Sequence, residues 1–498
     1  MTSLRVNAIA NTVGRLATAV LWVVATPFVL GQLGPERFGI WSLFFAFNAY
    51  LLSFDLGVGR TMVRFVAAQR PGGSRRALAK TVGWGLWAAL AMGLVWALAL
   101  ELSRGWIGKA FHVPPGLMPE ALDALLIFAI GVVIMFPAQV MMASLQGFER
   151  IDLSNLCMTV GVLVHVVLLY LALAAGLGLR GAATAGAVGQ VVAGSLAWIM
   201  VGRRIHEMPA GDEGQRPPWR EMLNFSAALQ VLGVLIMLQI QSGRTVLGLL
   251  GNLRMVAEYE LAFRVASAVG GLPILIRDPV IPTISRVWDG ENPATVQPMF
   301  ESISWWVYMS SALTLGILWL TADDLVRVWL GAGNERIADL IRLWVLAHAA
   351  NLAYAPGVAV ARGIGLPMFE ILSYAAALVT CVGLAILWVP HQGTAGAVLA
   401  VAVSYCVGLV VFMALFHRRG SAFPFWPWFW HNFVPPVLAG WLAVLSCGLL
   451  LGMPAVAGRL PPVGLVRGMM IALLYVCVLT ALMLAARALA LRRRVPRS

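Results

Sequence analysis

The chain has 498 residues, of which 60% are hydrophobic and 11% are charged. Soluble domains are only about half apolar, so this composition excludes a water-soluble globular protein. The formal net charge of +13 resides largely in arginines between apolar stretches, which indicates membrane topology rather than nucleic-acid binding.

Apolar stretches of about 18 to 25 residues follow one another along nearly the whole chain, and each is long enough to cross about 30 Å of hydrocarbon. Backbone groups inside lipid need partners within their own segment, so these stretches predict helices. The sequence therefore predicts an all-α integral membrane protein with about fourteen transmembrane helices. The predicted helices cover residues 8–31, 39–66, 80–101, 120–145, 152–176, 182–202, 222–250, 256–287, 297–320, 336–363, 368–389, 394–416, 434–454 and 465–489.

Two short motifs recur along the chain. Leu33-Gly34-Pro35-Glu36-Arg37-Phe38 follows the first predicted helix, and Leu250-Gly251-Asn252-Leu253-Arg254-Met255 follows the seventh. Thr184-Ala185-Gly186-Ala187-Val188 opens the sixth, and Thr394-Ala395-Gly396-Ala397-Val398 opens the twelfth. Because six helices separate the copies, the recurrence predicts two parallel pseudo-symmetric lobes. The predicted divisions are an N-lobe at 1–202, a cytoplasmic linker at 203–221, a C-lobe at 222–416, and helices 13 and 14 with a basic cytoplasmic tail at 417–498.

The arginines and lysines between the predicted helices indicate orientation. One alternating set of connections carries about twice as many of them as the other, and such loops stay in the cytoplasm. We therefore expect both termini in the cytoplasm and the chain in a bacterial inner membrane. The five cysteines lie singly within apolar spans and predict neither a disulfide framework nor a metal site.

Polar residues inside the first predicted helix form a stripe with a spacing of three or four. A charge at the bilayer centre costs at least about 2.5–3.5 kcal/mol, so a buried stripe needs a watery cavity or a neighbouring helix. The alternative is that its first residues lie in the headgroup layer and the arginine snorkels to join them. The stripe consists of Asn7, Asn11, Arg15, Thr18 and Trp22.

The seventh and eighth predicted helices are polar in a comparable way. Glu260 and Arg264 stand four residues apart in the eighth, a spacing that favours an ion pair on one face. Such a pair either belongs to a functional cavity or only stabilises the packing of helices. The polar residues of the seventh helix are Asn224, Gln230, Gln239, Gln241 and Arg244.

Prolines interrupt the end of the eighth predicted helix. Pro273, Pro279 and Pro282 lie beside Arg277 and Asp278, and each proline removes a backbone hydrogen bond. A kink or broken segment is expected there, and we interpret it as a candidate hinge.

The second predicted helix closes with Asp55, Arg60 and Arg64. Arg60 and Arg64 share a face near the expected cytoplasmic interface. They are interpreted either as functional cations or as snorkelling anchors, with Asp55 as an ion-pair partner.

Motifs typical of enzymes do not occur in the sequence. It has no zinc-type cluster of histidines and cysteines, no phosphate-binding glycine loop and no Gly-x-Ser-x-Gly elbow. We expect no catalysis, no cofactor and no metal.

Three segments carry a resemblance to a known family. They are Leu33-Gly34-Pro35-Glu36-Arg37-Phe38-Gly39, then Phe54-Asp55-Leu56-Gly57-Val58-Gly59-Arg60 with Arg64-Phe65, then Leu145-Gln146-Gly147-Phe148-Glu149-Arg150. With these segments the chain resembles, over essentially its whole length, the polysaccharide flippases of the multidrug/oligosaccharidyl-lipid/polysaccharide (MOP) exporter superfamily, the Wzx-type O-antigen and exopolysaccharide translocases.

The resemblance implies two six-helix lobes around a central cavity, alternating access, and an undecaprenyl-diphosphate-linked oligosaccharide as substrate. Guanidinium groups bind phosphate with fork geometry, which suits a diphosphate headgroup. By motif for Arg60 and by helix position for the others, the implied substrate-binding residues are Arg15, Arg60, Arg264, Arg244, Asn11 and Gln239. Asp55, Glu258 and Glu260 are the candidates for carrying a coupling ion. Expected partners are the lipid-linked glycan, membrane lipids and a polysaccharide polymerase, without nucleic acid.

Three alternatives stay open at this point. A multidrug antiporter of the same fold should concentrate acids in one lobe and favour aromatic contacts for organic cations, whereas this chain is expected to bury more arginines than acids. A membrane-embedded glycosyltransferase or ligase for lipid-linked glycans should carry a large loop with catalytic carboxylates. The third alternative is a structural partner of a polymerase complex.

Overall fold

The computed structural model describes residues 2–53, 57–69, 74–210, 219–288, 292, 295–419, 425–458 and 460–494. The side chains of 2–17, 19, 60, 219–230, 419, 457 and 485–494 are outside this description. All regular secondary structure in the described part is helical. The contacts divide the chain into a first unit, Met1–Ala257, and a second unit, Glu258–Ser498.

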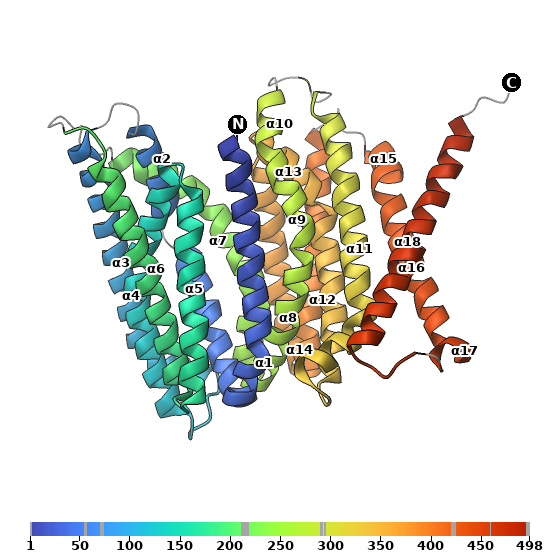
Figure 1. The fold of residues 1–498 in the computed structure, drawn as a ribbon, viewed down its shortest axis with the longest axis horizontal. Coiled ribbons are helices and arrows are strands. Elements are labelled where there is room, and N and C mark those ends of the chain that lie inside the picture. The colour runs from blue at the N-terminus through green and yellow to red at the C-terminus, as the bar shows by residue number, and fades with distance from the viewer. Residues whose placement is uncertain are drawn as a thin grey trace. The chain divides into compact units, whose positions relative to one another are not determined.

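Seven helices form the bulk of the first unit. They are α1 (Thr2–Ser53), α2 (Val58–Gln69), α3 (Arg75–Ala110), α4 (Met118–Gly147), α5 (Ile151–Ala174), α6 (Gly178–His206) and α7 (Trp219–Leu250). Helices α3 to α6 pack as a bundle, and α7 packs against α1 and α2 (Figure 1). The division between the units therefore falls after α7, whereas the sequence places the lobe boundary before it; the duplication itself stays a prediction.

Helix α1 is a hairpin of two arms rather than one rod. Gly34 has a non-helical backbone with φ 73°, a conformation that glycine adopts without steric cost. The ring of Trp22 in the first arm lies 5.7 Å from Trp41 and 5.3 Å from Phe45 in the second arm. These contacts require the arms to run side by side, which agrees with two separate predicted helices around the Leu33-Gly34 motif.

The two copies of this motif meet inside the first unit. A Cβ on Gly39 would lie 2.1 Å from the carbonyl oxygen of Leu253, so only glycine fits at this contact. Leu253 is the first residue of α8 (Leu253–Gly270), whose continuation belongs to the second unit.

The helix predicted over 39–66 is wrong in its extent. The second arm of α1 ends at Ser53, and α2 begins at Val58. Gly57 has φ 70°, a left-handed conformation that interrupts a helix. Asp55 lies outside the described residues.

The second unit holds the remaining helices. They are α9 (Leu272–Arg277), the 3-10 turn η1 (Asp278–Val280), α10 (Ile281–Val287), α11 (Gln297–Leu330), α12 (Glu335–Ala353), α13 (Ala355–Gly363), α14 (Met368–Arg419), α15 (Phe425–Trp428), the π-helical turn η3 (Phe429–Phe433), α16 (Val434–Gly452), α17 (Pro454–Ala457) and α18 (Leu465–Arg494). Helices α16 and α18 pack against each other and against α11.

Helix α14 is a second hairpin, with its turn at Gly393, where φ is 56°. The hydroxyl of Ser373 in its first arm donates to the carbonyl of Gly408 in its second arm, 2.8 Å away. The span predicted over 336–363 is found as one candidate membrane span, Glu335–Gly363, but its helix is interrupted at Tyr354. Helix α12 ends at Ala353, and α13 restarts with Pro356 in its first turn. Proline is tolerated in a first turn but breaks a helix interior.

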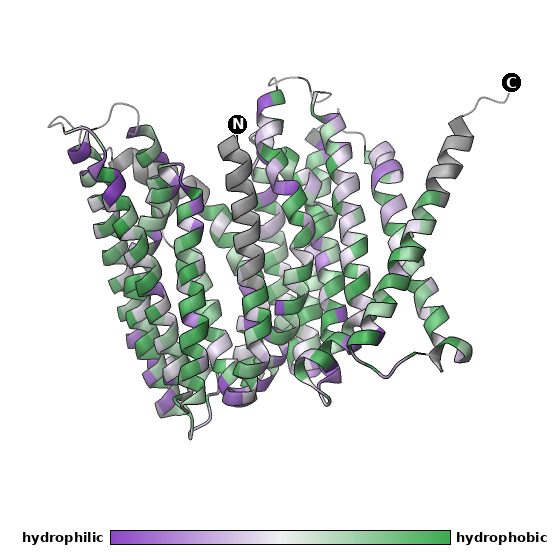
Figure 2. Cartoon of the chain, in the orientation of Figure 1, coloured by the Kyte–Doolittle hydropathy of each residue, from purple (hydrophilic) through white to green (hydrophobic). Residues whose placement is uncertain are grey.

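Eleven helices of the described part are long and apolar enough to cross a membrane. Hydrophobic residues cover most of their length, and hydrophilic residues gather near their ends (Figure 2). Large apolar side chains point outward, among them Trp87, Leu102, Val379 and Leu449, each more than 70% exposed. The chain is thus an all-α multi-pass membrane protein. Helices α1 and α14 are hairpins, so each of them supplies two arms. Counted in this way, the fold agrees with about fourteen membrane crossings, and that number stays a prediction.

Candidate functional site

The predicted pair on α8 forms as an ion pair within the second unit. The Nε of Arg264 lies 2.7 Å from Oε1 of Glu260, one helical turn away. Their side chains are 9% and 5% exposed. Two opposite charges removed from solvent stabilise each other. The pair therefore holds an acid and a base together in the buried part of α8.

Aromatic packing fixes the same helix against α12. The ring of Trp344 lies 5.2 Å from Tyr259 and 5.0 Å from Phe263, one turn apart on α8. One turn further on, the hydroxyl of Ser267 lies 3.5 Å from Nε2 of His348. This row gives α8 a fixed rotation about its axis, and that rotation sets where Glu260 and Arg264 lie.

Glu258 occupies the beginning of the second unit and joins three helices. Its carboxylate accepts a hydrogen bond from the Thr394 hydroxyl at 3.1 Å and lies 3.7 Å from Nε of Arg336. Thr394 directly follows the turn of the α14 hairpin, and Arg336 lies in the first turn of α12. Glu258 thus ties the ends of α8, α12 and α14 together, and its coupling role stays a prediction.

Arg244 and Gln239 lie on α7 in the first unit, and both are buried, with 2% and 0% of their surface exposed. The Nη1 of Arg244 donates to the backbone carbonyl of Ser42 in the second arm of α1, 3.3 Å away. Nearby, the hydroxyls of Tyr50 and Thr245 lie 2.7 Å apart. These contacts anchor α7 to α1, so a substrate role for Arg244 and Gln239 would add to a packing role.

The side chains of the other predicted site residues lie outside the described part of the chain. Asn11 and Arg15 belong to the first arm of α1, and Arg60 belongs to α2, with side chains outside the described ones. Asp55 is not among the described residues. Their roles in binding or coupling stay predictions.

The proline-rich segment after α8 is broken into short pieces, as its sequence predicts. Helix α8 ends at Gly270, and α9, η1 and α10 each begin with a proline in their first two positions, namely Pro273, Pro279 and Pro282. Each proline lies where a missing N–H is tolerated. The segment is also held in place, since the Ser285 hydroxyl donates to the carbonyl of Gly363 at 2.9 Å. A hinge function stays a prediction.

Sequence reasoning missed a further buried ion pair in the second unit. The guanidinium of Arg362 donates to both carboxylate oxygens of Glu370 at 2.8 and 2.6 Å, and Glu370 is 1% exposed. The sequence feature that could have indicated this pair is the turn between the two residues, which contains Gly365 and Pro367. In the structure Gly365 has φ 79°, and Pro367 directly precedes α14. Such a turn brings residues eight apart face to face.

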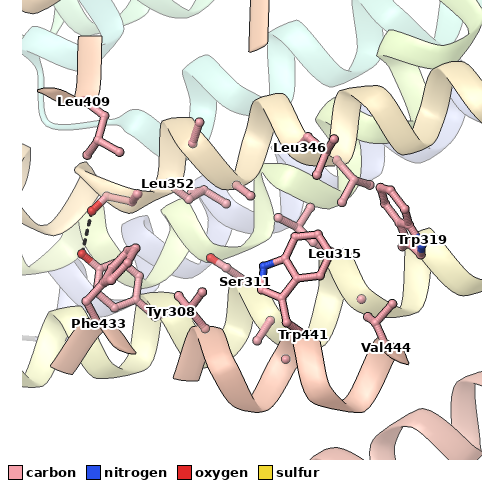
Figure 3. A pocket seen from close by; sticks show the side chains of 18 of the residues that line it. Tyr308, Ser311, Leu315, Trp319, Leu346, Leu352, Leu409, Phe433, Trp441 and Val444 are labelled. Carbon is pink, nitrogen blue, oxygen red and sulfur yellow. Dashed lines mark hydrogen bonds between the residues drawn. The ribbon is translucent and has the colours of Figure 1, made fainter. Parts of the chain in front are cut away.

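An apolar cavity of about 280 Å³ lies in the second unit between α11, α12, α14 and α16 (Figure 3). Its hydroxyl groups are engaged elsewhere: that of Tyr308 donates to the carbonyl of Ala353 at 2.6 Å, that of Ser311 to Val307, and that of Tyr475 to Ala312. None of the described residues that line it is charged. This cavity suits a hydrocarbon group and offers nothing to a diphosphate.

Metal binding finds no support in the described part of the chain, where no three histidine, cysteine, aspartate or glutamate side chains gather.

Several solved structures have a similar fold. A structure named lipid II flippase MurJ in an inward closed conformation matches with a TM-score of 0.73 and 12% identity, over 97% of this chain and 99% of that one. An inward-facing multidrug resistance MATE family transporter matches with a TM-score of 0.70 and 16% identity, over 81% of this chain and 95% of that one. A MOP superfamily transporter from Pyrococcus furiosus matches with a TM-score of 0.58 and 17% identity, over 84% and 96%.

No curated protein sequence is significantly similar to the chain. A family match covers residues 4–288, from the start of α1 to the end of the broken segment after α8. The family is described as polysaccharide biosynthesis protein, and because the match spans more than half of the chain, the protein belongs to this family.

Proposed function

We propose that the protein is a flippase that moves undecaprenyl-diphosphate-linked oligosaccharide from the cytoplasmic to the periplasmic leaflet for polysaccharide export. The observation that carries the proposal is a transporter fold in a chain of a polysaccharide biosynthesis family. An oligosaccharide cannot cross about 30 Å of hydrocarbon unaided, because its hydroxyl groups would lose their hydrogen bonds to water. A protein with this fold supplies a polar route while the prenyl tail stays in lipid.

The α8 ion pair is the centre of the proposed mechanism. A diphosphate can take the place of Glu260 beside Arg264, because a guanidinium binds phosphate and carboxylate oxygens with the same fork geometry. Glu260 would then need a proton or another cation, since a second anion at the same site is unfavourable. Substrate binding and ion binding are thereby linked at one helical turn, and Arg15, Arg60 and Arg244 are proposed as additional cations along the route.

Alternating access would then carry the occupied site from one side to the other, with the segment around Pro273, Pro279 and Pro282 as hinge. No bond is broken, so the protein acts as a transporter and not as an enzyme. We place it in the bacterial inner membrane with both termini in the cytoplasm, where a polysaccharide polymerase is a candidate partner on the periplasmic side.

The test is an export assay in cells that depend on this chain. Arg264→Ala should accumulate undecaprenyl-diphosphate-linked glycan on the cytoplasmic face and lower exported polysaccharide at least about tenfold. Arg327→Ala is the control, because this arginine of the same unit is exposed in the last turn of α11. Normal export by Arg264→Ala at equal membrane abundance would contradict the cationic site.

The resemblance to MATE transporters supports one alternative, a multidrug antiporter. Cells lacking the protein would then become sensitive to organic cations while polysaccharide export continued. That outcome would replace the flippase proposal.

A further inference from the structure

A second cavity, of about 230 Å³, lies inside the first unit among both arms of α1 and helices α4, α5 and α6. Aromatic rings form its walls. The ring of Trp22 lies 5.3 Å from Phe45 and 5.0 Å from His165, both nearly perpendicular to it. Phe44 and Phe128 stack at 5.1 Å on another part of the lining.

Three polar side chains, Asn48, His165 and Gln190, line this aromatic cavity. The amide of Asn48 donates to the thioether sulfur of Met135 at 3.3 Å, and thioethers are weak acceptors. Gln190 makes no hydrogen bond to any described residue. His165 and Gln190 lie well inside the spans Ile151–Ala174 and Gly178–His206. An amide without a full set of partners is costly at membrane depth, so Asn48 and Gln190 require water or a polar ligand.

The cavity is small and is kept open by residues with little or no side chain. Gly131 and Gly186 belong to the lining, and a Cβ on Gly186 would already contact the imidazole of His165 at 3.5 Å. Sites for drug-sized ligands occupy about 300–1,000 Å³, so this one suits a single ring.

The combination of groups matches one class of ligand. A pyranose ring presents C–H faces that stack on aromatic rings, and hydroxyls at its edge that donate to and accept from amides and imidazole. Among the described side chains that line the cavity, His165 alone is acidic or basic, and this favours a neutral ligand. We propose that this cavity binds one sugar ring of the lipid-linked glycan, an inference that rests on the proposed flippase function.

The test compares binding of sugar-bearing and bare lipid by the full-length protein in lipid nanodiscs. The probes are undecaprenyl diphosphate carrying glucose, galactose or N-acetylglucosamine, each measured against undecaprenyl diphosphate alone. The wild-type protein should bind at least one sugar-bearing probe about tenfold more tightly than the bare lipid. Asn48→Leu and Gln190→Leu should each abolish that preference and leave affinity for the bare lipid within about twofold.

Gln139→Leu is the matched control, since this glutamine of α4 lines a different cavity of the same unit. Two outcomes would overturn the sugar site and leave the flippase proposal standing. One is that Asn48→Leu and Gln190→Leu retain the sugar preference. The other is that the wild-type protein binds the bare lipid but shows no preference for a sugar-bearing lipid. Failure of the wild-type protein to bind any of the lipids would overturn both. A third outcome would also overturn the sugar site. If none of the cavity variants changes the sugar preference and His165→Gln shifts the pH dependence of transport, the cavity is a proton site instead.

Discussion

At the scale of single residues, two buried acids of this protein lie in ion pairs. Glu260 with Arg264 and Glu370 with Arg362 are both intrahelical or short-range pairs with at least one member almost fully buried. The first is predictable from its spacing of four. The second depends on a turn between two helices, and only the folded chain shows that the carboxylate receives two hydrogen bonds.

Removing one partner of the Arg362 pair should destabilise the protein. We expect Glu370→Ala to lower the free energy of unfolding by about 3 kcal/mol, the low end for a broken buried pair, because Arg362 is one-third exposed. The double variant Arg362→Met with Glu370→Leu should recover most of this loss. The measurement is thermal unfolding of the purified protein in detergent.

Asp339→Asn is the control for that experiment. Asp339 pairs with Arg342 but its side chain is 75% exposed, so the change should cost less than about 1 kcal/mol. Equal losses for Glu370→Ala and Asp339→Asn would show that burial of the pair contributes nothing.

At the scale of helices, glycines decide where elements turn and touch. The Leu33-Gly34 motif was recognisable in the sequence as a connection between two helices, and hydropathy gave most of the spans. The division at Gly57 and the restart at Pro356 were not predicted, because each break lies within one mainly apolar stretch that is long enough to cross a membrane. The cavity lined by Asn48, His165 and Gln190 could not be predicted either, since these residues come from three helices and only Trp22 lay on a recognised polar stripe.

Gly39 allows a close contact with the backbone of another helix. We expect Gly39→Ala to cost about 1–3 kcal/mol or more, because its Cβ would meet the backbone oxygen of Leu253 at 2.1 Å and backbone cannot move aside as a side chain can. Gly31→Ala, where nothing lies within 4 Å, should instead raise helix stability by about 0.5–1 kcal/mol. The yield of monodisperse protein after extraction and its melting temperature measure both effects. Similar behaviour of the two variants would contradict the steric argument.

At the scale of the whole molecule, the arginine distribution and the hairpins together predict an orientation. Connections rich in arginine should face the cytoplasm, and the turn between α3 and α4 should face the periplasm. Gly116 in that turn is exposed with open space around it, and Ala210 after α6 is exposed at the opposite end of the same unit.

A cysteine at each of these positions tests the orientation. In a variant whose five native cysteines are replaced, a membrane-impermeant maleimide should label Gly116→Cys in intact spheroplasts and label Ala210→Cys only after the membrane is opened. The reason is that short loops holding arginine resist translocation. Arg203 and Arg204, a few residues before Ala210, should therefore keep the loop after α6 in the cytoplasm. The opposite labelling pattern would place both termini in the periplasm. It would also reverse the side from which Arg264 and the aromatic cavity first meet a substrate, and the direction of flipping proposed above would have to be reversed with it.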